Sequence, residues 1–123
     1  MATIETELVA ALAAVTASGG RVYPERWPQD VMFPAITYQL ISAVPEAALN
    51  RTVGAWRDLY QIDCYAQTRS AVVTLSTQVQ AALYAFHGTT INVLSLAIEN
   101  VRDMSDPATQ LRRRIVEVVI VHE

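Results

Sequence analysis

The sequence has no lysine and a single cysteine, and these two absences narrow its chemistry. All nine basic residues are arginine, and twelve acidic residues give a formal net charge of −3. Proteins that bind duplexes neutralise phosphates with clustered Lys and Arg, so tight nucleic-acid binding is disfavoured. One cysteine forms no internal disulfide, and Cys/His pairs at metal-binding spacing are absent. The sequence therefore predicts neither a disulfide framework nor a zinc site.

Long hydrophobic runs and a basic leader are also missing. No apolar stretch reaches the roughly 18–20 residues that a membrane span needs. The first residues, MATIETELVAALAAV, carry acids where a signal peptide carries bases. We therefore expect a soluble, unexported protein with no membrane partner. A length of 123 residues predicts a single domain, residues 1–123, that folds without disulfides or metals.

The segment 55–66 predicts the longest strand, placed centrally in a sheet. Its odd positions are mostly polar, whereas its even positions are mostly apolar and run Trp56, Asp58, Tyr60, Ile62, Cys64 and Ala66. This alternation is typical of a strand with one face on a core and one face wet or shared with a partner. We expect the next helix to cover the apolar face. Cys64 then becomes a buried thiol, since no histidine lies near it in sequence.

The remaining periodicity predicts the fold. Helical spacing covers 3–17, with Thr3 as N-cap, and 68–86, with His87 in the last turn and Gly88 ending the helix. The other predicted strands are 35–42, 90–101 and 110–122, with a connection at 45–54 and a polar turn at 102–107. The order helix, two strands, helix, two strands predicts an α+β domain. Its four-stranded, mainly antiparallel sheet carries both helices on one face.

The segment 21–34, RVYPERWPQDVMFP, combines three prolines with large apolar side chains. Prolines at this density disfavour helix and interior strand alike. We expect an ordered loop. Its aromatic residues either pack back on the domain's own core or wait for a neighbouring subunit.

The last predicted strand begins with three arginines and ends with an unbroken apolar run. Alternation sends Arg113 to one face and Arg112 and Arg114 to the other. They either pair with Asp103 and Asp106 or contact an acidic partner surface. From 118 to 121 both faces are apolar, which indicates an inner strand or a subunit interface.

Catalytic constellations are missing from the sequence. Asp58 and Asp63 have opposite parity on one strand and cannot act as paired carboxylates at one site. No serine lies in a nucleophile elbow, and no glycine-rich loop precedes a helix to hold phosphate. Both histidines, His87 and His122, lie at element ends. The sequence therefore predicts no enzyme, no catalytic or metal-binding residue and no cofactor.

Several strings resemble a known family in their order and spacing. They are RVYP at 21–24, FPAITY at 33–38 with Ile41-Ser42, YQIDCYA at 60–66, the second helix at 72–83 and the turn at 103–107. Together they span nearly the whole chain and are similar to the tail completion, or tail-to-head joining, proteins of long-tailed bacteriophages.

The resemblance implies a non-enzymatic virion part at the head-proximal end of the tail, assembled in the cytoplasm of the bacterial host. Such a protein stops tail-tube growth and forms a ring, commonly of six copies, that docks onto the connector. The implied partners are further copies, a tail tube protein and a head connector protein. DNA passes through without specific binding. No catalytic residue is carried over.

Elementary geometry agrees with six copies. A compact domain of this length has a radius of gyration of about 14 Å and a diameter of roughly 36 Å. Six touching spheres of that size enclose a hole of about 36 Å, whereas four leave only about 15 Å. A ring is a heterologous assembly in which each subunit needs two different patches. We expect the contacts to involve Tyr23, Trp27, Phe33, Arg51, Arg113 and Val119.

Two other functions fit the sequence. In the first, the chain is a stand-alone, dimeric α+β domain that binds a small molecule. In the second, it is a different part of the same virion, such as a tube subunit or a connector adaptor.

Overall fold

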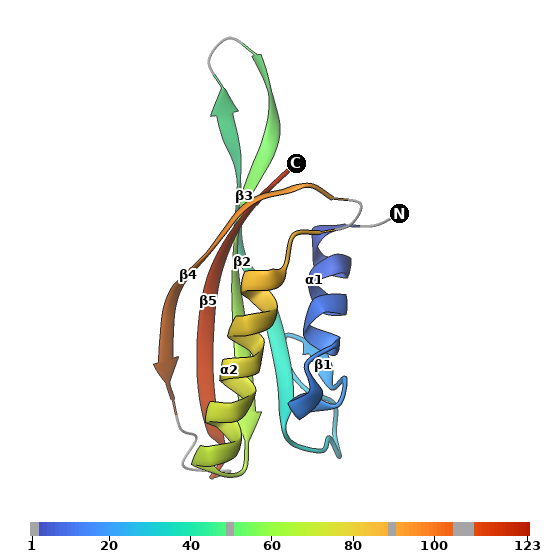
Figure 1. Ribbon diagram of the computed structural model, residues 1–123, viewed down its shortest axis with the longest axis vertical. Helices are drawn as coiled ribbons and strands as arrows, with labels where there is room; N and C mark the ends of the chain where they lie inside the picture. The colour runs from blue at the N-terminus through green and yellow to red at the C-terminus, as the bar shows by residue number, and fades with distance from the viewer. Residues whose placement is uncertain (1–2, 49–50, 89–90, 105–109) are drawn as a thin grey trace.

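The computed structural model describes residues 3–48, 51–88, 91–104 and 110–123. Two helices lie on one face of a single twisted sheet (Figure 1). In chain order the elements are α1 (Ile4–Ala13), the 3₁₀ helix η1 (Thr16–Ser18), β1 (Val22–Pro24), β2 (Ala35–Ala48), β3 (Arg51–Ala66), α2 (Arg69–Ala85), β4 (Val93–Asp103) and β5 (Arg112–His122).

The sheet has five strands, not the four that the sequence predicted. Their order is β1-β2-β3-β5-β4, and every pair is antiparallel except the parallel pair of β1 and β2. The α+β class and the placement of both helices on one face are confirmed. The missed strand, β1, lies in the proline-rich segment. It is three residues long and ends at Pro24 on the sheet edge, where a residue without an N–H is tolerated.

Helix α1 begins as predicted and ends early. The Thr3 hydroxyl accepts a hydrogen bond from the N–H of Thr6 at 3.1 Å, which caps the first turn. The helix stops at Ala13, four residues before the predicted end, and the chain continues into η1. Gly19 closes η1 with a φ of +58°, the left-handed conformation that glycine adopts without strain.

Helix α2 also ends earlier than its periodicity predicted. Its last residue is Ala85, so His87 and Gly88 lie beyond the helix and not in its last turn. Gly88 has a φ of +75°, and a Cβ there would lie 2.1 Å from the carbonyl oxygen of Ile91. Only glycine fits this close approach, which turns the chain from α2 toward β4.

Strand β3 is the longest and the central strand, as predicted. It has 16 residues and pairs with both β2 and β5. Tyr60, Ile62, Cys64 and Ala66 are buried in the core that the helices cover. Trp56 departs from the pattern, with 44% of its surface exposed.

The expected connection at 45–54 does not exist as a separate segment. Pro45 pairs with Trp56, Glu46 with Ala55 and Ala48 with Arg51, so β2 and β3 continue as a ribbon that projects past the helices (Figure 1). A bulge between Leu40 and Ser42 inserts one extra residue into β2.

Strand β5 lies between β3 and β4, which settles why its end lacks alternation. Val118 and Ile120 are fully buried and Val119 keeps 8% exposure, as expected of an inner strand. Strand β4 runs from Val93 to Asp103, so the first two residues of the predicted turn belong to a strand. Met104 follows the strand, and residues 105–107 of that turn lie outside the described residues.

The hydrophobic core fills the space between the two helices and the sheet. It includes Leu8 and Leu12 from α1, Val79 from α2, Ile62 from β3 and Val116 from β5. Among the described residues, no helix is long and apolar enough to cross a membrane.

We expect Leu8→Ala to lower the free energy of unfolding by about 2–5 kcal/mol, because Leu8 is fully buried and its truncation leaves a cavity. The matched control is Leu94→Ala on β4, where half of the side chain is exposed; it should change stability by about 0.5 kcal/mol or less. Urea denaturation of both variants checks this. Equal losses would contradict the placement of α1 on the core.

Candidate functional site

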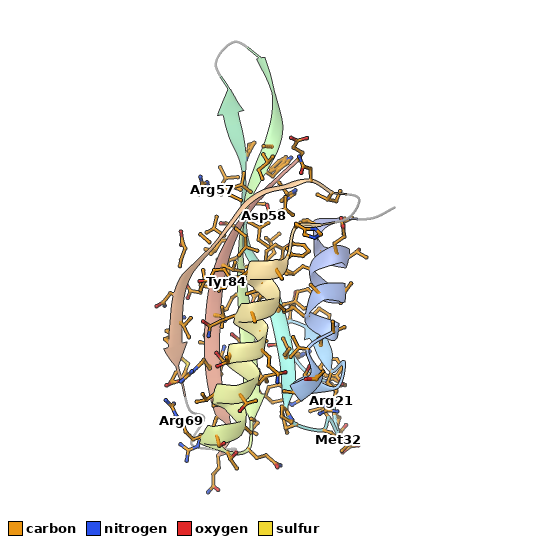
Figure 2. The ribbon with its side chains drawn as sticks, in the orientation of Figure 1. Arg21, Met32, Arg57, Asp58, Arg69 and Tyr84 are labelled. Carbon is orange, nitrogen blue, oxygen red and sulfur yellow. The ribbon has the colours of Figure 1, made fainter. Side chains whose placement is uncertain are left out.

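The aromatic residues of the proline-rich loop pack within their own chain. The Trp27 ring meets Tyr65 of β3 edge-on at a centroid distance of 4.3 Å, and Phe33 meets Trp27 at 5.3 Å. Tyr23 lies in β1 opposite Thr37 and is half-buried. Met32, at the outer end of the same loop, is 70% exposed (Figure 2). The loop therefore has both an inward-packed part and an exposed apolar part.

A polar cluster lies beside these rings, on the face of the sheet opposite the helices. Arg113 donates from Nη2 to Oδ2 of Asp63 at 2.7 Å, and its guanidinium lies 5.6 Å from the Tyr65 ring centroid. Gln61 also donates to the Asp63 carboxylate, at 3.1 Å. The Nε of Arg113 is buried and has no hydrogen-bond partner in the described part of the chain. Arg113 thus pairs with Asp63, not with the predicted Asp103.

The predicted pairing holds for the neighbouring arginine. Arg114 donates from Nε to Asp103 at 2.7 Å, and Arg69 at the start of α2 donates to the same carboxylate at 2.6 Å. These hydrogen bonds lower the pKa of Asp103 to about 2. Arg102 of β4 pairs with Glu117 of β5. Asp106 lies outside the described residues.

A buried pair that the sequence did not reveal joins β3 to the end of β5. Nε2 of His122 lies 2.7 Å from Oδ2 of Asp58, and both side chains are almost fully buried. Figure 2 shows Asp58 beside Arg57 near the base of the projecting hairpin. Nδ1 of the same imidazole lies 3.2 Å from the carbonyl oxygen of Glu123.

Both ring nitrogens of His122 thus lie within hydrogen-bond distance of an oxygen atom, one on the Asp58 side chain and one on the main chain. The pair fastens the end of β5 to the base of the hairpin.

A groove of about 450 Å³ runs between α1 and α2, and alanines form most of its wall. The carboxylate of Glu7 lines it and accepts a hydrogen bond from the N–H of Ile91 at 2.8 Å. His87 is the other ionisable side chain of the wall. A small-molecule site combines apolar walls with a few polar groups aimed at one ligand. Both ionisable side chains of this wall already contact the main chain, Glu7 at Ile91 and His87 at the carbonyl oxygen of Gly88.

The six residues predicted for subunit contacts do not form one surface. Trp27, Phe33 and Arg113 gather around Tyr65. Arg51 begins β3 at the tip of the hairpin, at the other end of the molecule (Figure 1). Val119 lies within the sheet, opposite Leu59 and Ala97. Among the described residues, no group of three His, Cys, Asp or Glu side chains could hold a metal ion.

Comparison with known proteins identifies the family. The model of the family described as Tail completion protein gp17 matches residues 6–123. The chain belongs to this family. It is therefore a structural component of a phage virion tail.

A solved structure supports the fold of this tail completion family member. A chain in the structure described as the virion of a native gene transfer agent (GTA) particle superposes with a TM-score of 0.62 at 17% identity. The match covers 93% of this chain and 86% of that chain. At this identity the likeness concerns the fold. Comparison with curated protein sequences gives no match.

We expect Arg113→Ala to destabilise the domain by about 2 kcal/mol or more, because it leaves the buried Asp63 carboxylate without its cation. The matched control is Arg102→Ala, which removes the more exposed pair with Glu117 and should cost about 1 kcal/mol or less. Denaturation at pH 7 compares them. A smaller loss for Arg113→Ala would contradict the role of the buried pair.

Burial raises the pKa of Cys64 from 9.0 to about 12. At pH 8 the fraction of Cys64 present as thiolate is then about a thousandfold lower in the native protein than in the unfolded chain. We therefore expect iodoacetamide to react with the native protein at least about a hundredfold more slowly than with the protein unfolded in urea. The neutral thiol's contribution to stability is complete below pH 9 and lost as pH rises toward 12. Fast alkylation of the folded protein would contradict this burial.

Proposed function

We propose that this protein ends the phage tail tube and joins the tail to the head connector as a ring of subunits, commonly six. The observation that carries the proposal is the match of the tail completion family over residues 6–123. The protein's partners in this role are further copies of itself, the tail tube protein and the head connector protein. It acts at the head-proximal end of the tail.

The charge distribution supports a ring through which DNA slides. The formal net charge is −3, and the arginines at positions 69, 102, 113 and 114 each face a carboxylate of the same chain. An arginine engaged in this way is less available to a phosphate than a free one. Four of the nine arginines are engaged in this way, and together with the negative net charge this suits passage of DNA without specific binding.

Two regions are proposed as subunit contacts. The first is the aromatic loop, with Trp27, Phe33 and the adjoining Tyr23 and Arg113, whose exposed edge carries Met32. The second is the β2–β3 hairpin with Arg51, which projects beyond the helices (Figure 1). Val119 lies inside the sheet and contributes to a contact only through the 8% of its surface that is exposed. Two different patches are what a heterologous ring requires.

The alternative within the same virion is a role as a connector adaptor or a tube subunit, and the gene deletion described below distinguishes it. No specific observation favours the small-molecule-binding alternative. Its best location, the groove between the helices, is lined mostly by alanine.

Deletion of this gene from the phage or prophage that carries it tests the role. We expect negative-stain electron microscopy to show DNA-filled heads beside unjoined tails, some of them overlong. The physical reason is that an unterminated tube continues to add subunits and presents no surface to the connector.

Plasmid-borne wild-type protein should restore joined particles, and a frameshifted copy of the same gene is the control. Infectious particles of normal form without the gene would reject the proposal. Tails that are absent altogether would point to a tube subunit.

A further inference from the structure

The large apolar side chains that remain exposed lie mostly along the two free edges of the sheet. Strand β1 ends at Pro24, opposite Tyr38, so no described strand pairs with the outer edge of β2 beyond that point. Strand β4 ends the sheet on the other side. Nine large hydrophobic side chains in the described part are exposed, and five of them lie on these two edge strands: Leu40, Ile41, Val44, Leu94 and Val101. A sixth, Trp56 of β3, lies opposite Pro45 of β2.

We propose that the free edge of β2, residues 39–45, packs against the β4 edge of a second copy, residues 93–103. The inference rests on the proposed ring and adds a contact between sheet edges to the regions proposed for it above. It extends the sheet of one subunit into that of the next.

The β2 edge is uncovered in the isolated chain over its whole length. Every residue from 39 to 45 is exposed, although the strand lies next to the central strand of the sheet. Leu40, Ile41, Val44 and Trp56 each expose between 44% and 52% of their surface. Leu40 lies opposite Tyr60 and Trp56 lies opposite Pro45, both on the helix side of the sheet, whereas Val44 lies opposite Arg57 on the other side. The edge therefore exposes apolar side chains on both faces of the ribbon.

The lengths of the two edges are compatible. The proposed β2 edge, 39–45, has seven residues, and strand β4 has 11. At about 3.3 Å per residue the two edges measure roughly 23 and 36 Å. The β4 edge is therefore long enough to cover the β2 edge over its whole length.

The charges of the two edges permit this approach. Residues 39–45 contain no charged side chain. On β4, Arg102 pairs with Glu117 and Asp103 pairs with Arg114, which leaves Glu99 as the charge with no ion pair among those described. Although the chain has a net charge of −3, the contact between these two edges therefore brings few like charges together.

The irregularities of the edges add apolar side chains to both of them. The bulge in β2 and the first bulge in β4 add Ile41 and Leu94, both about half exposed. Bulges and proline, here Pro45, discourage unspecific pairing of free edges, so the contact has to be a specific one. The second bulge in β4 adds Glu99. Because the β2 and β4 edges differ, the contact is heterologous, and its repetition closes a ring when the rotation allows.

Photocrosslinking inside the virion tests the contact. The photoreactive residue benzoylphenylalanine replaces Val44, and particles from the producing strain are irradiated. We expect a product of two chains, with the crosslinked peptide mapping to 93–103. The matched control places the same residue at Tyr84, which is 68% exposed on α2 and belongs to the helix layer, not to either edge strand. It should give no crosslink to β4.

The outcomes separate this inference from the proposed function. Infectious particles in which Val44 crosslinks only to a different protein, or to another part of a second copy, would overturn the edge contact and leave the tail role standing. Particles that contain no copy of the chain would overturn both.

A charge placed on the edge gives an independent test. We expect Leu94→Asp to lower the infectious titre by roughly tenfold or more, because the contact would bury an unpaired carboxylate. Tyr84→Asp, with the same charge on the helix layer, should leave the titre unchanged. Urea denaturation must show both variants as stable as wild type, as the exposure of both sites predicts. Equal titres for folded variants would overturn the inference.

Discussion

The structure depends on a difference in length between its helices and its strands. Helix α2 has 17 residues and rises about 1.5 Å per residue, so it spans about 26 Å. Strand β3 has 16 residues and spans about 53 Å at 3.3 Å per residue. A helix layer built in this way covers about half of the strands beneath it. The other half becomes a ribbon with no core of its own, and two strands alone are marginally stable in water.

This difference explains which sequence predictions succeeded. Alternation in 55–66 identified the central strand and its core face, because Tyr60 and Ile62 do lie under the helices. The same pattern failed at Trp56, since periodicity says which face a side chain occupies and not whether anything covers it. Pro45 and Gly54 suggested a connection, but an uncovered ribbon tolerates both, so neither marks the end of a strand.

The polar contacts required knowledge of strand register. Arg113 and Asp63 are 50 residues apart, and only the β3–β5 pairing, in which Asp63 lies opposite Ile115 and Tyr65 opposite Arg113, places them together. Alternation along each strand predicted the correct parity for both residues but not their register. Asp58 and His122 were missed for the same reason. Their contact becomes evident only once Trp56 is known to lie opposite His122.

The turn at Gly88 ties one free edge of the sheet to the helix layer. Ile91 follows that turn and donates its N–H to Glu7 of α1, and β4 begins two residues later at Val93. The start of β4 is therefore coupled to α1 through one hydrogen bond to a side chain, so a change in the position of this sheet edge is felt at the outer helix as well as in the sheet.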